Sequence, residues 1–129
     1  MRILVVDDHA PTIELMELTL TSVGHSVRSA TTVAEALEIA AGYAPHVILS
    51  DLTFSSVAGG AEDGHSFARA VRAEPDHVGV AMLAITGVVS PSELQAAIDS
   101  GFDDVVVKPF DVEALIGRID ELGRAVPDQ

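Results

Sequence analysis

The strongest constraint on the fold is an alternation, repeated five times, of a short apolar run and an amphipathic helical pattern. The apolar runs span residues 3–6, 26–30, 47–51, 80–86 and 105–107. Four of them are apolar enough to be buried on both faces, which is typical of a parallel sheet covered by helices on each side. The second run is short and more polar than the others, and this favours an edge strand.

Helical patterns follow each apolar run. Helix starts are predicted at Thr32, Ser90 and Asp111, which all carry side chains that can cap a helix. The first helix is expected to bury a stripe made of Ile13, Met16, Leu20 and Val23. The third is expected to bury Phe67, Ala70 and Val71, and the last to bury Val112, Leu115, Ile116, Ile119 and Leu122.

This organisation predicts a single α/β domain. Five strand–helix units with right-handed crossovers form a doubly wound sheet, and a polar second strand at its edge fits the flavodoxin-like strand order 2-1-3-4-5 with five flanking helices. We expect residues 1–123 to form this domain and residues 124–129 to form a frayed tail.

The charge of the chain restricts its partners. There are 20 acidic residues against 7 basic ones, for a formal net charge of −13. Such a surface repels phosphate backbones and anionic lipids, so direct binding of nucleic acid or membranes is not expected. The absence of cysteine excludes disulfides and thiolate chemistry, and no apolar run approaches the roughly 20 residues of a membrane span. The chain is therefore expected to be cytoplasmic.

Polar side chains stand where the apolar runs end. Asp7 and Asp8 follow the first run, Asp51 ends the third, Thr86 ends the fourth and Lys108 follows the fifth. The carboxyl ends of parallel strands meet at one edge of a sheet, and neighbouring strands lie about 4.8 Å apart. We therefore expect these five side chains to converge on one shallow pocket.

The acidic side chains of this pocket predict a metal site. Three carboxylates so close together repel one another, and a hard divalent cation removes that cost. Mg²⁺ favours carboxylate, carbonyl and water oxygens. Asp8 and Asp51 are the predicted direct ligands, Asp7 binds directly or through water, and the backbone carbonyl of Thr53 supplies a further oxygen.

The same pocket could stabilise a phosphoryl group bonded to Asp51. Of the phosphoryl oxygens, Mg²⁺ would neutralise one, the Lys108 ammonium another, and the Thr86 hydroxyl would bind a third. Beyond the nucleophile, the protein need only supply positioning and charge stabilisation. Lys108 is the only lysine in the chain, which weakens its reading as an ordinary surface charge.

Taken in order, these motifs resemble the receiver domains of bacterial response regulators. The resemblance covers residues 2 to about 123 and is carried by Asp7-Asp8, Asp51, Thr86-Gly87, Lys108-Pro109-Phe110 and the segment from Gly101 to Asp104. It implies Mg²⁺-dependent phosphotransfer to Asp51 from the phosphohistidine of a sensor histidine kinase or phosphotransfer protein. It also implies slow self-hydrolysis rather than metabolic enzyme activity, and a conformational switch.

The resemblance further implies a downstream protein partner on the face formed by the fourth helix, the fifth strand and the fifth helix. It also implies a monomer or weak dimer.

Two features depart from the family pattern. The pair Asp63-Gly64 arrives several residues late, which lengthens the loop after Asp51. Val105 stands where the family usually has a Tyr or Phe ring that moves with the residue at Thr86, so the relay to the surface is expected to differ. Phe102 nearby is expected to be a core residue.

Three other functions stay open at this point. The two departures favour a receiver-like binding module that signals without phosphorylation. A Mg²⁺-dependent phosphohydrolase with Asp51 as nucleophile is a second alternative, although Thr53 stands where a second acid is expected for proton transfer. A flavin or nucleotide binder is the least favoured, because no glycine-rich turn follows the first strand.

Overall fold

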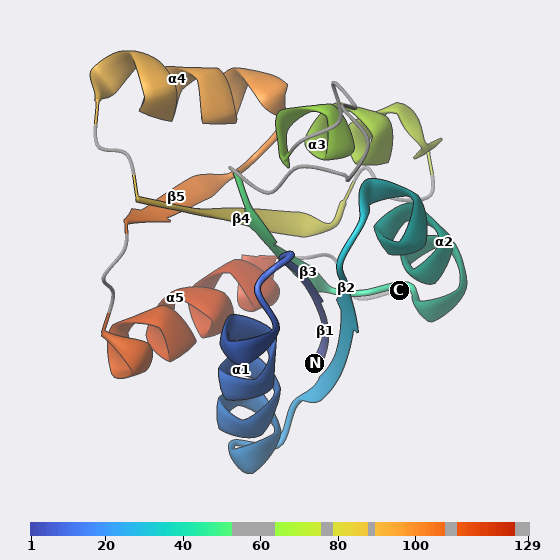
Figure 1. Cartoon of the computed structure of the whole chain (residues 1–129), viewed down its shortest axis with the longest axis vertical. Coiled ribbons are helices and arrows are strands. Elements are labelled where there is room, and N and C mark those ends of the chain that lie inside the picture. Colours follow the sequence, from blue (N-terminus) through green and yellow to red (C-terminus); the bar gives the residue numbers. More distant parts are fainter. Residues whose placement is uncertain (53–63, 76–78, 88–89, 108–110, 126–129) are drawn as a thin grey trace.

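The computed structural model describes residues 1–52, 64–75, 79–87, 90–107 and 111–125. Within these ranges, five strands and five helices alternate along the chain (Figure 1). The strands are β1 (Arg2–Val6), β2 (Ser26–Ala30), β3 (Val47–Asp51), β4 (Ala81–Thr86) and β5 (Asp104–Val107). The helices are α1 (Ala10–Ser22), α2 (Val33–Tyr43), α3 (Gly64–Ala73), α4 (Pro91–Ser100) and α5 (Val112–Ala125). None of the helices in the described ranges is long and apolar enough to cross a membrane.

The strands form one parallel sheet in the order β2-β1-β3-β4-β5, which confirms the predicted fold and topology. The more polar strand, β2, is at an edge as expected. Helices α1 and α5 cover one face of the sheet, and α2, α3 and α4 cover the other (Figure 1). The carboxyl ends of all five strands therefore lie at the same edge of the sheet, where the site was expected.

The sheet divides the apolar core into two layers. Alternate strand residues point to opposite faces, so Leu4 of β1 packs in the cluster with α2, α3 and α4, whereas Val5 packs in the cluster with α1 and α5. Phe67 of α3 is the largest fully buried side chain among the described residues. Among the described core residues, the only other aromatic ring is that of Phe102.

The predicted helix caps are present. The Thr32 side chain accepts a hydrogen bond from the backbone N–H of Glu35 at 3.1 Å, and Ser90 accepts one from the third residue of α4 at 3.2 Å. The Asp111 carboxylate accepts one from Glu113 at 3.1 Å. These contacts satisfy main-chain donors that have no partner inside the first helical turn.

We expect Thr32→Ala to lower the free energy of unfolding by about 1 kcal/mol, since it removes the cap of α2. Urea denaturation measures the change. Thr21→Ala is the matched control, because the Thr21 hydroxyl bonds only to carbonyls of its own helix. Equal stability of the two variants would contradict a capping role for Thr32.

Two of the predicted inward-facing positions are wrong. Val23 is 49% exposed, because α1 ends at Ser22 and the chain turns at Gly24, whose φ is 96°. In α3, Ala70 is only half-buried and its place in the core is taken by Ala68, which is fully buried. For Val23, the helix ends before the last residue of the apolar pattern. For Ala70, the helix is rotated about its axis relative to the expected orientation.

Two helices extend further along the chain than the sequence predicts. Helix α2 passes Gly42 and ends at Tyr43, and Ala44 adopts the left-handed conformation with a φ of 51°. Helix α5 continues to Ala125, two residues beyond the expected end of the domain at residue 123, and residues 126–129 lie outside the described ranges.

Helix α4 is attached mainly at its C-terminal end. Its only buried residues are Ala97 and Ser100. The His65 ring of α3 lies 2.8 Å from the Ser100 hydroxyl, and the Arg72 guanidinium donates to the carbonyl of Gly101 at 2.9 Å. The first two turns of α4 therefore contribute little to the core.

Strand β5 forms the other edge of the sheet. Val105 is half-buried and packs against the cluster on the α2, α3 and α4 side, and Phe102 is buried in that cluster, as predicted. Arg118 of α5 forms hydrogen-bonded ion pairs with Asp104 and Glu121. The bond to Asp104 is the main cause that raises the pKa of Arg118 above its ordinary value. The pair with Asp104 attaches α5 to the start of β5, whereas the pair with Glu121 lies within α5.

Candidate functional site

Buried polar residues concentrate at the carboxyl edge of the sheet. Asp7, Asp51 and Thr86 are 2%, 6% and 2% exposed. Only two other polar residues are buried in the described part of the chain, Ser50 and Ser100. Because burying polar groups costs free energy unless they are partnered, three such residues at the ends of neighbouring strands indicate a site rather than ordinary surface.

Asp7, Asp8 and Asp51 come together as the sequence predicted. One carboxylate oxygen of each lies within 4.8 Å of the others. Asp7 and Asp51 are buried, whereas Asp8 is exposed and forms the open side of the cluster. Three like charges in a half-buried space repel one another strongly, and hard oxygen ligands suit a small divalent cation. The donor set therefore fits Mg²⁺.

The main chain on both sides of Asp7 fixes its position. Its backbone N–H donates to the carbonyl of Ala30 at 3.1 Å, which extends the β1–β2 pairing by one residue. The backbone N–H of His9 donates to Asp7 Oδ1 at 2.9 Å. His9 itself is exposed and precedes α1, and its ring contacts Thr12. The contact to Asp7 was not predicted, although an Asp two residues before a helix start is a known signal for such a turn.

Asp51 is the last residue of β3 and is held between two main-chain contacts. Its backbone is paired with Ile85 in β4. The next residue, Leu52, is buried and donates its N–H to the carbonyl of Ile85 at 3.0 Å. The Ser50 hydroxyl donates to the carbonyl of Asp51 at 3.2 Å. The pairing thus continues past Asp51, and its side chain projects from ordered backbone.

Thr86 ends β4 at the same edge. In the sheet it is one residue beyond Ile85, the partner of Asp51, and it pairs with Val107 of β5. Thr53 and Lys108, the remaining predicted site residues, lie outside the described ranges, so their roles stay predictions. The described geometry therefore brings together the three acids and places Thr86 on the neighbouring strand.

Sequence comparison assigns a family to almost the whole chain. The family model described as "Response regulator receiver domain" matches residues 3–120. Response regulator MprA of Mycobacterium leprae (strain TN) is 36% identical over 129 residues, which cover 99% of this chain and 54% of that protein. The chain therefore spans about half the length of the curated relatives it matches.

Solved structures have the same architecture. The chemotaxis response regulator CheY4 of Vibrio cholerae matches with a TM-score of 0.85 and 28% identity, over 94% of this chain and 97% of that one. The receiver domain of the Francisella response regulator 1452 matches with a TM-score of 0.85 over 98% of both chains. Its identity is 22%, so this second likeness concerns the fold alone.

Proposed function

The chain belongs to the response regulator receiver domain family of two-component signalling, and on this premise we propose that Asp51 accepts a phosphoryl group in a Mg²⁺-dependent reaction. The donor is the phosphohistidine of a sensor histidine kinase or phosphotransfer protein in the cytoplasm. The observation that carries the proposal is the buried Asp51 carboxylate within 4.8 Å of those of Asp7 and Asp8.

The transfer exchanges one bond for another. A carboxylate oxygen of Asp51 attacks the phosphorus, the bond between phosphorus and the donor imidazole nitrogen breaks, and the imidazole keeps the electron pair. The product is an acyl phosphate on Asp51. Because the β3–β4 pairing continues past Asp51, the nucleophile is positioned before the donor arrives, which is the main contribution a protein makes to this reaction.

The other site residues balance charge. Asp7, Asp8 and Asp51 would hold Mg²⁺, and the Thr53 carbonyl would be a further ligand. When bound, Mg²⁺ supplies positive charge that offsets the carboxylates and the phosphoryl oxygens. The N–H of His9 keeps the Asp7 carboxylate in a fixed orientation. The Thr86 hydroxyl donates to one phosphoryl oxygen, and the Lys108 ammonium pairs with another.

The response is read by a protein partner on the face of α4, β5 and α5. Ile98 of α4 is 44% exposed and is one of four exposed large apolar side chains in the described residues. Val105 lacks the ring that the resemblance leads one to expect, so the relay of the signal from Thr86 to this face differs from the family pattern.

Incorporation of label from radioactive acetyl phosphate tests the proposal. We expect label only when Mg²⁺ is present, complete loss when the metal is chelated, and release by neutral hydroxylamine, which cleaves acyl phosphates. Label that resists hydroxylamine would contradict an acyl phosphate. If neither acetyl phosphate nor beryllofluoride with Mg²⁺ changes the protein, the binding module without phosphorylation is the better assignment.

A further inference from the structure

Among the described residues, strand β2 has main-chain groups along one side that pair with no other segment. The N–H of Ser26 donates to the carbonyl of Met1 at 2.9 Å, and the carbonyl of Ala30 accepts from the residue after β1. Even-numbered residues of β2 therefore direct their main-chain groups toward β1. In a parallel strand the intervening residues direct theirs to the opposite side. Val27 and Ser29 thus point their N–H and C=O groups away from the sheet, as a template for an added strand.

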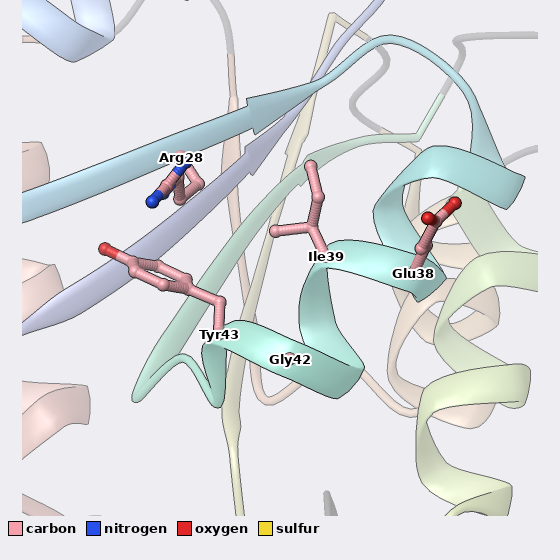
Figure 2. A pocket seen from close by; sticks show the side chains of 5 residues that line it. All are labelled: Arg28, Glu38, Ile39, Gly42 and Tyr43. Carbon is pink, nitrogen blue, oxygen red and sulfur yellow. The ribbon is translucent and has the colours of Figure 1, made fainter.

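A groove of about 280 Å³ lies beside this edge (Figure 2). It is lined by Arg28 of β2 and by Glu38, Ile39, Gly42 and Tyr43 of α2. An added Cβ on Gly42 would have no heavy atom within 4 Å. The groove is therefore open above the helix backbone at this position, and a side chain from another molecule can enter it.

The Arg28 guanidinium is positioned for an anion. It lies 5.6 Å from the centroid of the Tyr43 ring, a distance at which the two attract, and the Tyr43 hydroxyl bonds to Ser26. Among the described residues, no carboxylate forms an ion pair with Arg28. A guanidinium that is oriented in this way and has no ion-pair partner among the described residues is a good binding group for a carboxylate.

We infer that this edge and groove bind an extended peptide segment of a partner protein that carries a carboxylate side chain. The peptide backbone pairs with Val27 and Ser29, and its carboxylate binds Arg28. An apolar side chain two residues away, on the same face of the added strand, contacts Ile39. A peptide added to a sheet edge gains affinity from main-chain hydrogen bonds and specificity from pockets for alternate side chains. This inference does not depend on phosphorylation of Asp51.

A second copy of the chain fits the edge less well. Antiparallel pairing that uses both outward-facing residues sets Val27 opposite Ser29 of the other copy. It then sets Arg28 directly opposite Arg28, and like charges in such positions are destabilising. The net charge of both copies adds to the repulsion. An acidic segment satisfies the guanidinium instead.

The test titrates the isotope-labelled full chain with end-capped heptapeptides of mixed sequence and a fixed central glutamate, followed by NMR. We expect shifts of the Val27 and Ser29 amides, and binding at least about tenfold weaker when the central residue is glutamine, since a charge-assisted hydrogen bond is lost. Arg28→Met should remove this difference. Arg69→Met, which removes the same charge from an exposed position of α3, should preserve it.

Two substitutions at one position separate groove binding from folding. Gly42→Gln fills the groove and should weaken binding, whereas Gly42→Ala adds only a methyl group in open space and should leave it unchanged. The inference is overturned if the two edge amides do not shift at millimolar peptide, or if glutamate and glutamine peptides bind equally. Concentration-dependent shifts of these amides without peptide would assign the edge to a second copy instead.

Discussion

Asp51→Asn is expected to abolish labelling by acetyl phosphate. The amide oxygen of asparagine is a poor nucleophile and cannot form the acyl phosphate, so no hydroxylamine-labile label should appear with Mg²⁺ present. Asp99→Asn is the matched control, because it makes the same change at an exposed position of α4 and should label like the unsubstituted chain. Undiminished labelling of Asp51→Asn would exclude Asp51 as the acceptor.

The same variant also reports on the acidic cluster. Asparagine has nearly the shape of aspartate but no charge, so it relieves the repulsion among the carboxylates of Asp7, Asp8 and Asp51. Without metal, we expect the melting temperature of Asp51→Asn to be no lower than that of the unsubstituted chain. A large fall in melting temperature would mean that lost labelling reflects unfolding, and the assignment would then rest on the hydroxylamine test.

Phe67→Ala is expected to have the largest effect on stability. Phe67 is fully buried and packs in the cluster with α2, α3 and α4. Truncation of a buried ring removes its burial free energy and leaves a cavity, which together cost about 3–5 kcal/mol. Urea denaturation measures the loss. Leu18→Ala is the control, since Leu18 is 72% exposed and its truncation should change stability by less than about 0.5 kcal/mol.

A loss below about 1 kcal/mol for Phe67→Ala would contradict tight packing of α3 on the sheet. The labelling experiment then gives a second readout, because α3 is the next described element after the strand that ends at Asp51. A destabilised but folded variant should still accept the phosphoryl group.

Most of the fold follows from features that are local in sequence. The strand pattern is visible because β1, β3 and β4 are buried on both faces. The polar β2 is an edge strand as expected. The same expectation of full burial was wrong for β5, which is half-buried because it forms the other edge of the sheet. The caps at Thr32 and Ser90 were predictable because each involves residues three apart. The exposure of Val23 was not, because it depends on where Gly24 turns the chain out of α1.

The acidic cluster was predictable for a different reason. Once the strand order is known, residues at the carboxyl ends of neighbouring strands must lie close together, so Asp7, Asp8 and Asp51 meet without any local signal. The groove beside β2 was not predictable. It depends on the side chains of Arg28 and Tyr43, which stand fifteen positions apart in the sequence and match no motif.

Helix α4 is attached mainly at its C-terminal end, so the residues that pack in the core and the residues proposed to contact a partner are different ones. Its fully buried residues in the described chain are Ala97 and Ser100, near its C-terminal end. Substitutions at exposed positions of its first turns should therefore cost little free energy of folding, so the proposed partner surface can change without loss of stability. The residues that a partner protein would contact on this helix can therefore change during evolution while the acidic cluster at the carboxyl edge of the sheet stays the same.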